Sequence, residues 1–177
     1  MRGLLVLAAC AVALCGCGSS SSTARPPRLG IGFDGRIGAV RYGELKRRVD
    51  AALGKGEETR LDGIPDTLVF YPRGQVYVDY FYAGATSAHR PPPPATALAG
   101  VILTRSSLYK TASGVGVGST YKQLQKGVNL DCRVPPGFNF VPRSCQREPA
   151  PYGHPITVFR IDQTTQRVDE ILMANGD

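Results

Sequence analysis

The sequence predicts an α+β fold of two units, each a helix followed by an antiparallel hairpin, placed after a leader and a tether. Apolar residues at helical spacing recur twice, at 42–53 and at 121–128. Predicted hairpin strands follow each stretch, and those after the first alternate and are rich in Val and Tyr. We therefore expect a diverged internal repeat, with 30–112 as the first unit and 113–177 as the second. The alternative is a coincidence of amphipathic spacing.

The segment 1–16 has the features of a bacterial signal peptide. Arg2 supplies a positive charge, and 4–14 form an apolar run that is too short to span a bilayer. Leu14 and Gly16, directly before Cys17, resemble the lipobox of bacterial lipoproteins. In such proteins the cysteine receives a lipid and becomes the mature N-terminus.

We therefore expect Cys17 to be lipidated, with palmitate among the acyl chains. Each buried methylene contributes about 0.8 kcal/mol to membrane binding, so two or more chains anchor a protein stably. The segment 17–29 is rich in Ser, Gly and Pro without an apolar period, which predicts a flexible tether. Two alternatives stay open, a lipobox that ends at Cys10 and an ordinary secretory signal.

The first unit is expected to begin with a helix over 42–53, because its apolar residues form one stripe and Gly54 fits the residue just past a helix end. A hairpin of 66–71 and 75–82 should follow, joined by a Pro-Arg-Gly turn. The four prolines of 91–94 then predict a stiff extended loop.

A further strand, 100–105, is expected between the units. The second helix should start after Thr120, which can form a capping box with Gln123. A second hairpin is expected from 156–161 and 168–173.

The cysteine count agrees with an exported chain. Cys10 and Cys15 would leave with the leader and Cys17 would take the lipid, which leaves Cys132 and Cys145 as one pair. An extracytoplasmic compartment is oxidising enough for a disulfide, which would contribute about 3 kcal/mol. The alternative is a metal-binding or catalytic thiol, and no CxxC or CxxH spacing accompanies either cysteine.

A helix followed by an antiparallel sheet, entered through a glycine-rich turn and then repeated, resembles the BamE-type (SmpA/OmlA) lipoproteins and the tandem units of β-lactamase inhibitor proteins. The residues that carry this resemblance are 37–54 and 115–128, with the hairpin after each. The resemblance implies a non-enzymatic binding or assembly module. This chain departs from the pattern because each half has one helix rather than two.

Catalytic patterns are weak. His89 and His154 lie in predicted loops without a neighbouring acid and nucleophile. The glycines of 114–118 lack the Walker lysine, and the SxxK matches at Ser107 and Ser119 lack their partner motifs. We therefore predict no enzyme, no cofactor and no metal site. The alternative is a small envelope hydrolase acting on cell wall or lipid.

Aromatic residues crowd the strand at 75–82. Tyr80 and Tyr82 should share one face of it, and Tyr77 and Phe81 the other. One face must cover the helix, and the second is a candidate platform for proteins or glycans. The candidate binding residues are therefore Tyr77, Phe81, Tyr80 and Tyr82, unless both faces are covered.

The formal net charge of +7 fits either a solvated basic surface or attraction to anionic lipids or wall polymers. Nucleic acid is excluded for an exported protein. We expect a membrane-anchored protein on the extracytoplasmic face that acts as a non-catalytic binding or envelope-assembly module. Its expected partners are the membrane, through the lipid, and an envelope protein or wall polymer.

Overall fold

The computed structural model describes residues 29–61, 67–83, 91–132, 144–146 and 154–175. The predicted signal peptide, Cys17, nearly all of the tether and His89 lie outside the described residues.

Close to half of the described residues lie in strands, which form two β-sheets. The larger sheet has seven antiparallel strands in the order β4-β5-β6-β7-β11-β10-β9. Its strands, in that order, are Glu57–Arg60, Thr67–Tyr71, Val76–Phe81, Leu98–Thr104, Arg167–Asn175, Pro155–Asp162 and Ser144–Gln146. The smaller sheet has the order β3-β2-β1-β8, in which only β1 and β8 pair in parallel. Its strands, in that order, are Val40–Arg41, Arg36–Ile37, Leu29–Gly32 and Tyr109–Lys110.

The predicted α+β fold of two helix-plus-hairpin units is wrong. The helices of the described chain, α1 at Lys46–Leu53 and α2 at Tyr121–Gly127, have only 8 and 7 residues. Strand β7 pairs with β6 on one side and with β11 on the other, so both predicted hairpins belong to one sheet. The physical reason is that each helix buries a single side chain fully, Val49 or Leu124, while the strands supply most of the apolar surface. Neither helix is long and apolar enough to cross a membrane.

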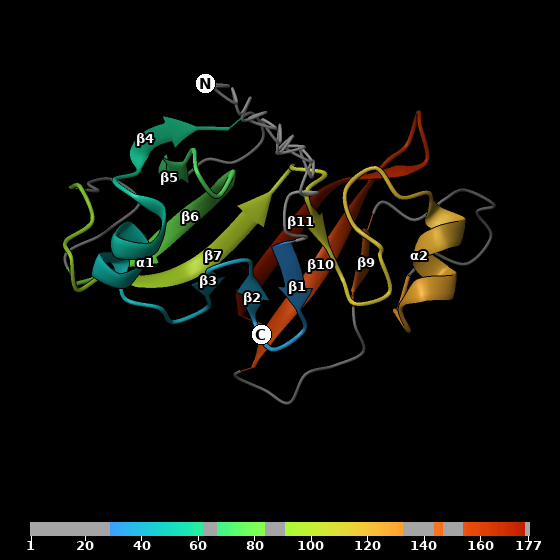
Figure 1. Cartoon of the computed structure of the whole chain (residues 1–177), viewed down its shortest axis with the longest axis horizontal. Coiled ribbons are helices and arrows are strands. Elements are labelled where there is room, and N and C mark those ends of the chain that lie inside the picture. The colour runs from blue at the N-terminus through green and yellow to red at the C-terminus, as the bar shows by residue number, and fades with distance from the viewer. Residues whose placement is uncertain (1–28, 62–66, 84–90, 133–143, 147–153, 176–177) are drawn as a thin grey trace, which may run out of the picture.

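The main core lies on one face of the seven-stranded sheet. In Figure 1, α1 and the short strands β1–β3 lie in front of this sheet, and α2 lies beyond β9. Side chains from both layers meet in one buried cluster, which includes Val49 of α1, Ile37 of β2, and Val78, Ile102 and Phe159 of the large sheet. The small sheet therefore completes a layer that two short helices alone would leave open.

Two local predictions are confirmed. At the start of α2, the Thr120 hydroxyl accepts a hydrogen bond from the Gln123 amide, and the Thr120 amide donates to Gln123 Oε1. Cys132 and Cys145 form a disulfide, which ties the segment after α2 to strand β9. Cys145 is buried opposite Phe159, so the bridge reaches the core.

Candidate binding face

The four predicted binding residues do not share one surface. In β6, Val76, Val78 and Tyr80 face the core, and Tyr80 is only 2% exposed. Tyr77 is half-buried and Phe81 is 52% exposed on the opposite face.

Tyr82, which follows the strand, is half-buried, and its hydroxyl donates a hydrogen bond to the Pro91 carbonyl. Tyr77 and Phe81 therefore remain as surface candidates, while Tyr80 lies in the core.

Tyr80 belongs to a polar network that joins α1 to the sheet. The Tyr71 hydroxyl donates to Asp50 Oδ1 at 2.8 Å and lies 2.7 Å from the Tyr80 hydroxyl. Lys46 Nζ lies 2.7 Å from Asp50 Oδ2. Burial is the main cause that raises the pKa of Tyr71 and of Tyr80 far above the ordinary value. Both phenols are therefore neutral at physiological pH, and the network holds the helix in place rather than supplying a nucleophile.

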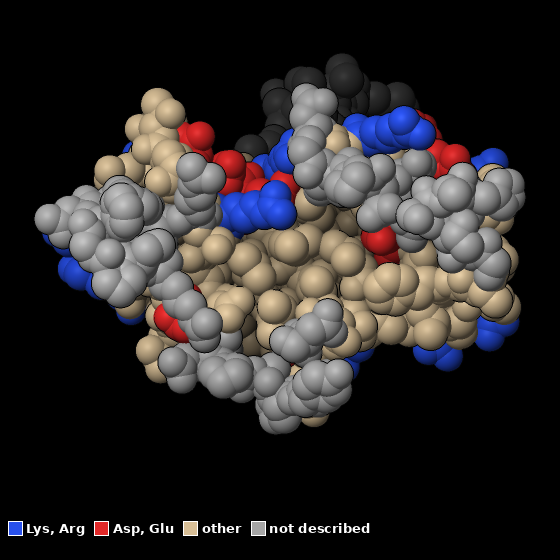
Figure 2. Space-filling view, turned by 180° about the vertical axis from the view of Figure 1, so that it is seen from behind, with Lys and Arg blue, Asp and Glu red and all other residues tan. Residues whose placement is uncertain are grey.

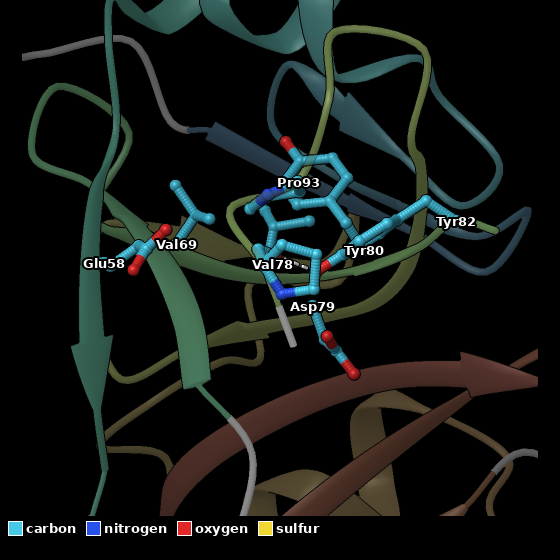
Figure 3. Close-up of a pocket in the computed structure, with 8 residues that line it drawn as sticks. Glu58, Val69, Val78, Asp79, Tyr80, Tyr82 and Pro93 are labelled. Carbon is cyan, nitrogen blue, oxygen red and sulfur yellow. Dashed lines mark hydrogen bonds between the residues drawn. The ribbon is translucent and has the colours of Figure 1, made fainter. Parts of the chain in front are cut away.

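A small pocket lies beside this network. Its volume is about 40 Å³, which holds water molecules but no substrate-sized ligand. Figure 3 shows side chains from β4, β5 and β6 gathered with the proline run. The lining residues are Glu58, Val69, Val78, Asp79, Tyr80, Tyr82, Pro91 and Pro93.

The other face of the large sheet carries a continuous apolar row. The pairing register sets Phe70 opposite Tyr77 and Tyr77 opposite Leu103. It then sets Leu103 opposite Leu172 and Leu172 opposite Val158, so the row crosses five strands. Leu103 is buried but lies outside the main core cluster, and the other four residues are half-buried. We call these five residues the apolar row.

The aromatic end of this face is ordered by ring contacts. The rings of Phe70 and Tyr77 stack with centroids 4.6 Å apart. Phe81 covers Gly100 of the neighbouring strand, because a Cβ built at Gly100 would lie 2.2 Å from the Phe81 ring. Leu98, the register partner of Phe81, is 44% exposed. Phe81 and Leu98 are therefore exposed to a partner on this face, and Phe70 and Tyr77 are half-buried on it.

Charged residues lie next to the apolar row. Glu170 is 2% exposed, and its Oε2 lies 2.9 Å from Arg105 Nη2. Its Oε1 lies 3.1 Å from Arg160 Nη1. Both arginine side chains are nearly half exposed. Because two cations contact one buried carboxylate, the three side chains together carry a net charge of +1. We call these three residues the arginine cluster.

Figure 2 looks at the molecule from behind Figure 1, on the side away from α1 and the small sheet. It shows a broad area without Lys, Arg, Asp or Glu, with charges of both signs gathered above it. Apolar and aromatic surface beside arginine is the composition that protein interfaces favour. We call this side of the seven-stranded sheet, which α1 and the small sheet do not cover, the open face.

Sequence reasoning identified Tyr77 and Phe81 but missed the rest of the open face. Val158 and Leu172 occupy alternate positions in strands that the sequence did predict, but local alternation does not tell which strands become neighbours.

Catalytic geometry is not found in the part of the chain that the structure describes. There, His154 is exposed, and no group of three or more His, Cys, Asp and Glu side chains is placed to hold a metal ion.

Comparisons with known protein families, with curated proteins and with solved structures give no match. The resemblance to BamE-type lipoproteins and β-lactamase inhibitor proteins therefore stays a prediction.

Proposed function

We propose that this protein is a lipid-anchored, extracytoplasmic binding module that holds a component of the cell envelope on its open face. The observation that carries the proposal is the apolar row, which extends over five strands on the side of the sheet away from α1 and the small sheet. The proposed activity is binding or envelope assembly without catalysis.

The location is supported by the N-terminal sequence. The apolar leader, the lipobox-like residues before Cys17 and the Ser-rich tether are together typical of a lipoprotein held at a membrane. A disulfide between the two cysteines that follow the tether agrees with an oxidising compartment.

The binding role is supported by the chemistry of the open face. Tyr, Phe and Arg are enriched where proteins recognise partners, because they bury large areas and still form directed contacts. Here an aromatic stack, Phe70 with Tyr77, lies on the same face as the exposed ring of Phe81 and the two arginines of the cluster. Docking of a partner would remove the remaining exposed apolar area of the half-buried side chains between them from water, which favours binding.

The test is capture of envelope material by the tagged full chain from detergent-solubilised membranes. We expect the double variant Tyr77→Ala, Phe81→Ala to lose most of the captured protein or glycan. Both side chains are partly exposed, so its melting temperature should fall by only a few degrees. The matched control is Tyr121→Ala, which removes a half-buried aromatic side chain from α2. Equal capture by the wild type and the double variant would contradict the proposal.

A further inference from the structure

The open face ends in a shallow depression beside the turn that joins β5 and β6. Its volume is about 300 Å³, and it is lined by Phe70, Pro72, Gln75, Tyr77, Arg105 and Ser106. We infer that this depression binds an acidic saccharide, a sugar unit that carries a carboxylate or a phosphate. The inference rests on the proposed function, because it names the chemical class of the component held at one end of the open face.

The first argument is the aromatic floor. Phe70 and Tyr77 stack on each other, and this contact fixes the orientation of both rings. Pro72 adds a third rigid apolar ring to the lining. A floor of this kind fits the C–H face of a pyranose ring, and its rigidity means that little side-chain entropy is lost on binding.

The second argument is the conformation of Gln75. Its φ of 48° lies in the left-handed region, which glycine adopts freely and other residues rarely adopt. Its main-chain carbonyl accepts a hydrogen bond from Thr104 Oγ1 at 2.9 Å, a contact that glycine would keep. Its side-chain Oε1 accepts from Ser106 Oγ at 2.6 Å, which leaves the amide N–H groups as donors for a ligand. Glycine would adopt this backbone more easily, so replacing Gln75 with glycine removes only what its side chain offers to the depression.

The third argument is charge. Arg105 lines the depression and contacts Glu170, which Arg160 also contacts. The cluster carries two positive charges and one negative charge, so it attracts an anionic group on the ligand. The guanidinium is planar and suits carboxylate or phosphate oxygens. In the proposed complex the sugar ring packs on Phe70 and Tyr77. Its hydroxyl groups accept hydrogen bonds from the Gln75 amide, and its carboxylate or phosphate contacts Arg105.

The experiment is calorimetric titration of the purified full chain in detergent. The acidic probes are galacturonate oligomers and glucose 6-phosphate, and the neutral probe is a galactose oligomer of matched length. We expect saturable binding of the acidic probes, about tenfold weaker binding of the neutral probe, and weaker acidic binding as salt is raised.

Two glycine variants separate binding from folding. Gln75→Gly removes the side chain and the backbone strain together, so the melting temperature should stay or rise while affinity falls about tenfold. The matched control is Gln166→Gly. Gln166 is also exposed and also has a left-handed φ, of 53°, but it lies in the β10–β11 turn and does not line the depression. It should gain similar stability and keep wild-type affinity. Tyr77→Ala should lose at least as much affinity as Gln75→Gly.

Absence of saturable binding, or wild-type affinity in Gln75→Gly, would overturn the inference. Equal affinity for acidic and neutral oligomers would also overturn it, because the charge argument would fail. If capture of envelope material depends on Tyr77 and Phe81 while no saccharide binds, the proposed function stands and this inference alone falls.

Discussion

Breaking the disulfide should destabilise the protein by about 3 kcal/mol. Cys132 and Cys145 are 13 residues apart, and for a closed loop of this size the chain-entropy relation gives about 3 kcal/mol at 25 °C. Reduction keeps both sulfur atoms in place, so the change in stability isolates the crosslink from packing. The local effect should be largest at β9, because this strand has only three residues and lies at the edge of the sheet.

The assay is urea unfolding followed by circular dichroism, with and without a reducing agent. We expect the reduced protein to unfold at a lower urea concentration, with a free energy of unfolding lower by about 3 kcal/mol. A Cys132→Ala, Cys145→Ala variant should lose somewhat more, because Cys145 is 1% exposed and its truncation leaves a cavity beside Phe159. That variant should not respond to the reducing agent. An unchanged unfolding midpoint, once thiol titration shows that the bridge is open, would refute the reasoning.

Three further predictions test other parts of the molecule. Globomycin, which blocks lipoprotein signal cleavage, should cause the full-length precursor to accumulate in cells, and an unchanged band on a gel would refute lipidation at Cys17. Burial raises the pKa of Tyr109 from 10.0 to about 12. The contribution of this shift to the free energy of unfolding is fully present below pH 10 and is lost as the pH rises to about 12. Tyr109 should therefore account for about 2 to 3 kcal/mol of the stability lost over that range, measured by phenolate absorbance and by urea unfolding of the wild type against Tyr109→Phe, since Tyr71 and Tyr80 add losses of their own. Gly100→Ala should cost about 1 to 2 kcal/mol in thermal unfolding, because its Cβ meets the Phe81 ring, and should cost almost nothing in a Phe81→Ala background.

The sequence allowed correct prediction of features that depend on nearby residues. The capping box needs only Thr120 and Gln123, and the cysteine pairing follows from counting. Alternation along β6 also predicted correctly that Tyr77 and Tyr80 lie on opposite faces.

Features that depend on distant pairing were missed. Strands of two residues, such as β2 and β3, are too short to show a period, so the small sheet left no signal. The polar strand β4, Glu57–Arg60, has no apolar alternation because it lies at an edge. The pairing of β7 with β11 joins residues far apart in the chain, which no local pattern encodes. The apolar row and the arginine cluster depend on that pairing, so the sequence could not predict them either.

The central place of β7 has a consequence for dissecting the molecule. Cutting the chain between 112 and 113 would separate β7 from β11 and leave a bare strand edge on each fragment. An unpaired strand edge pairs readily with other chains, so each fragment alone should tend to aggregate. When the two fragments are mixed, β11 should pair with β7 again and restore the sheet. The β7–β11 pairing is therefore a suitable place to split the chain for a two-fragment reporter, and the two halves are unsuitable for expression as independent domains.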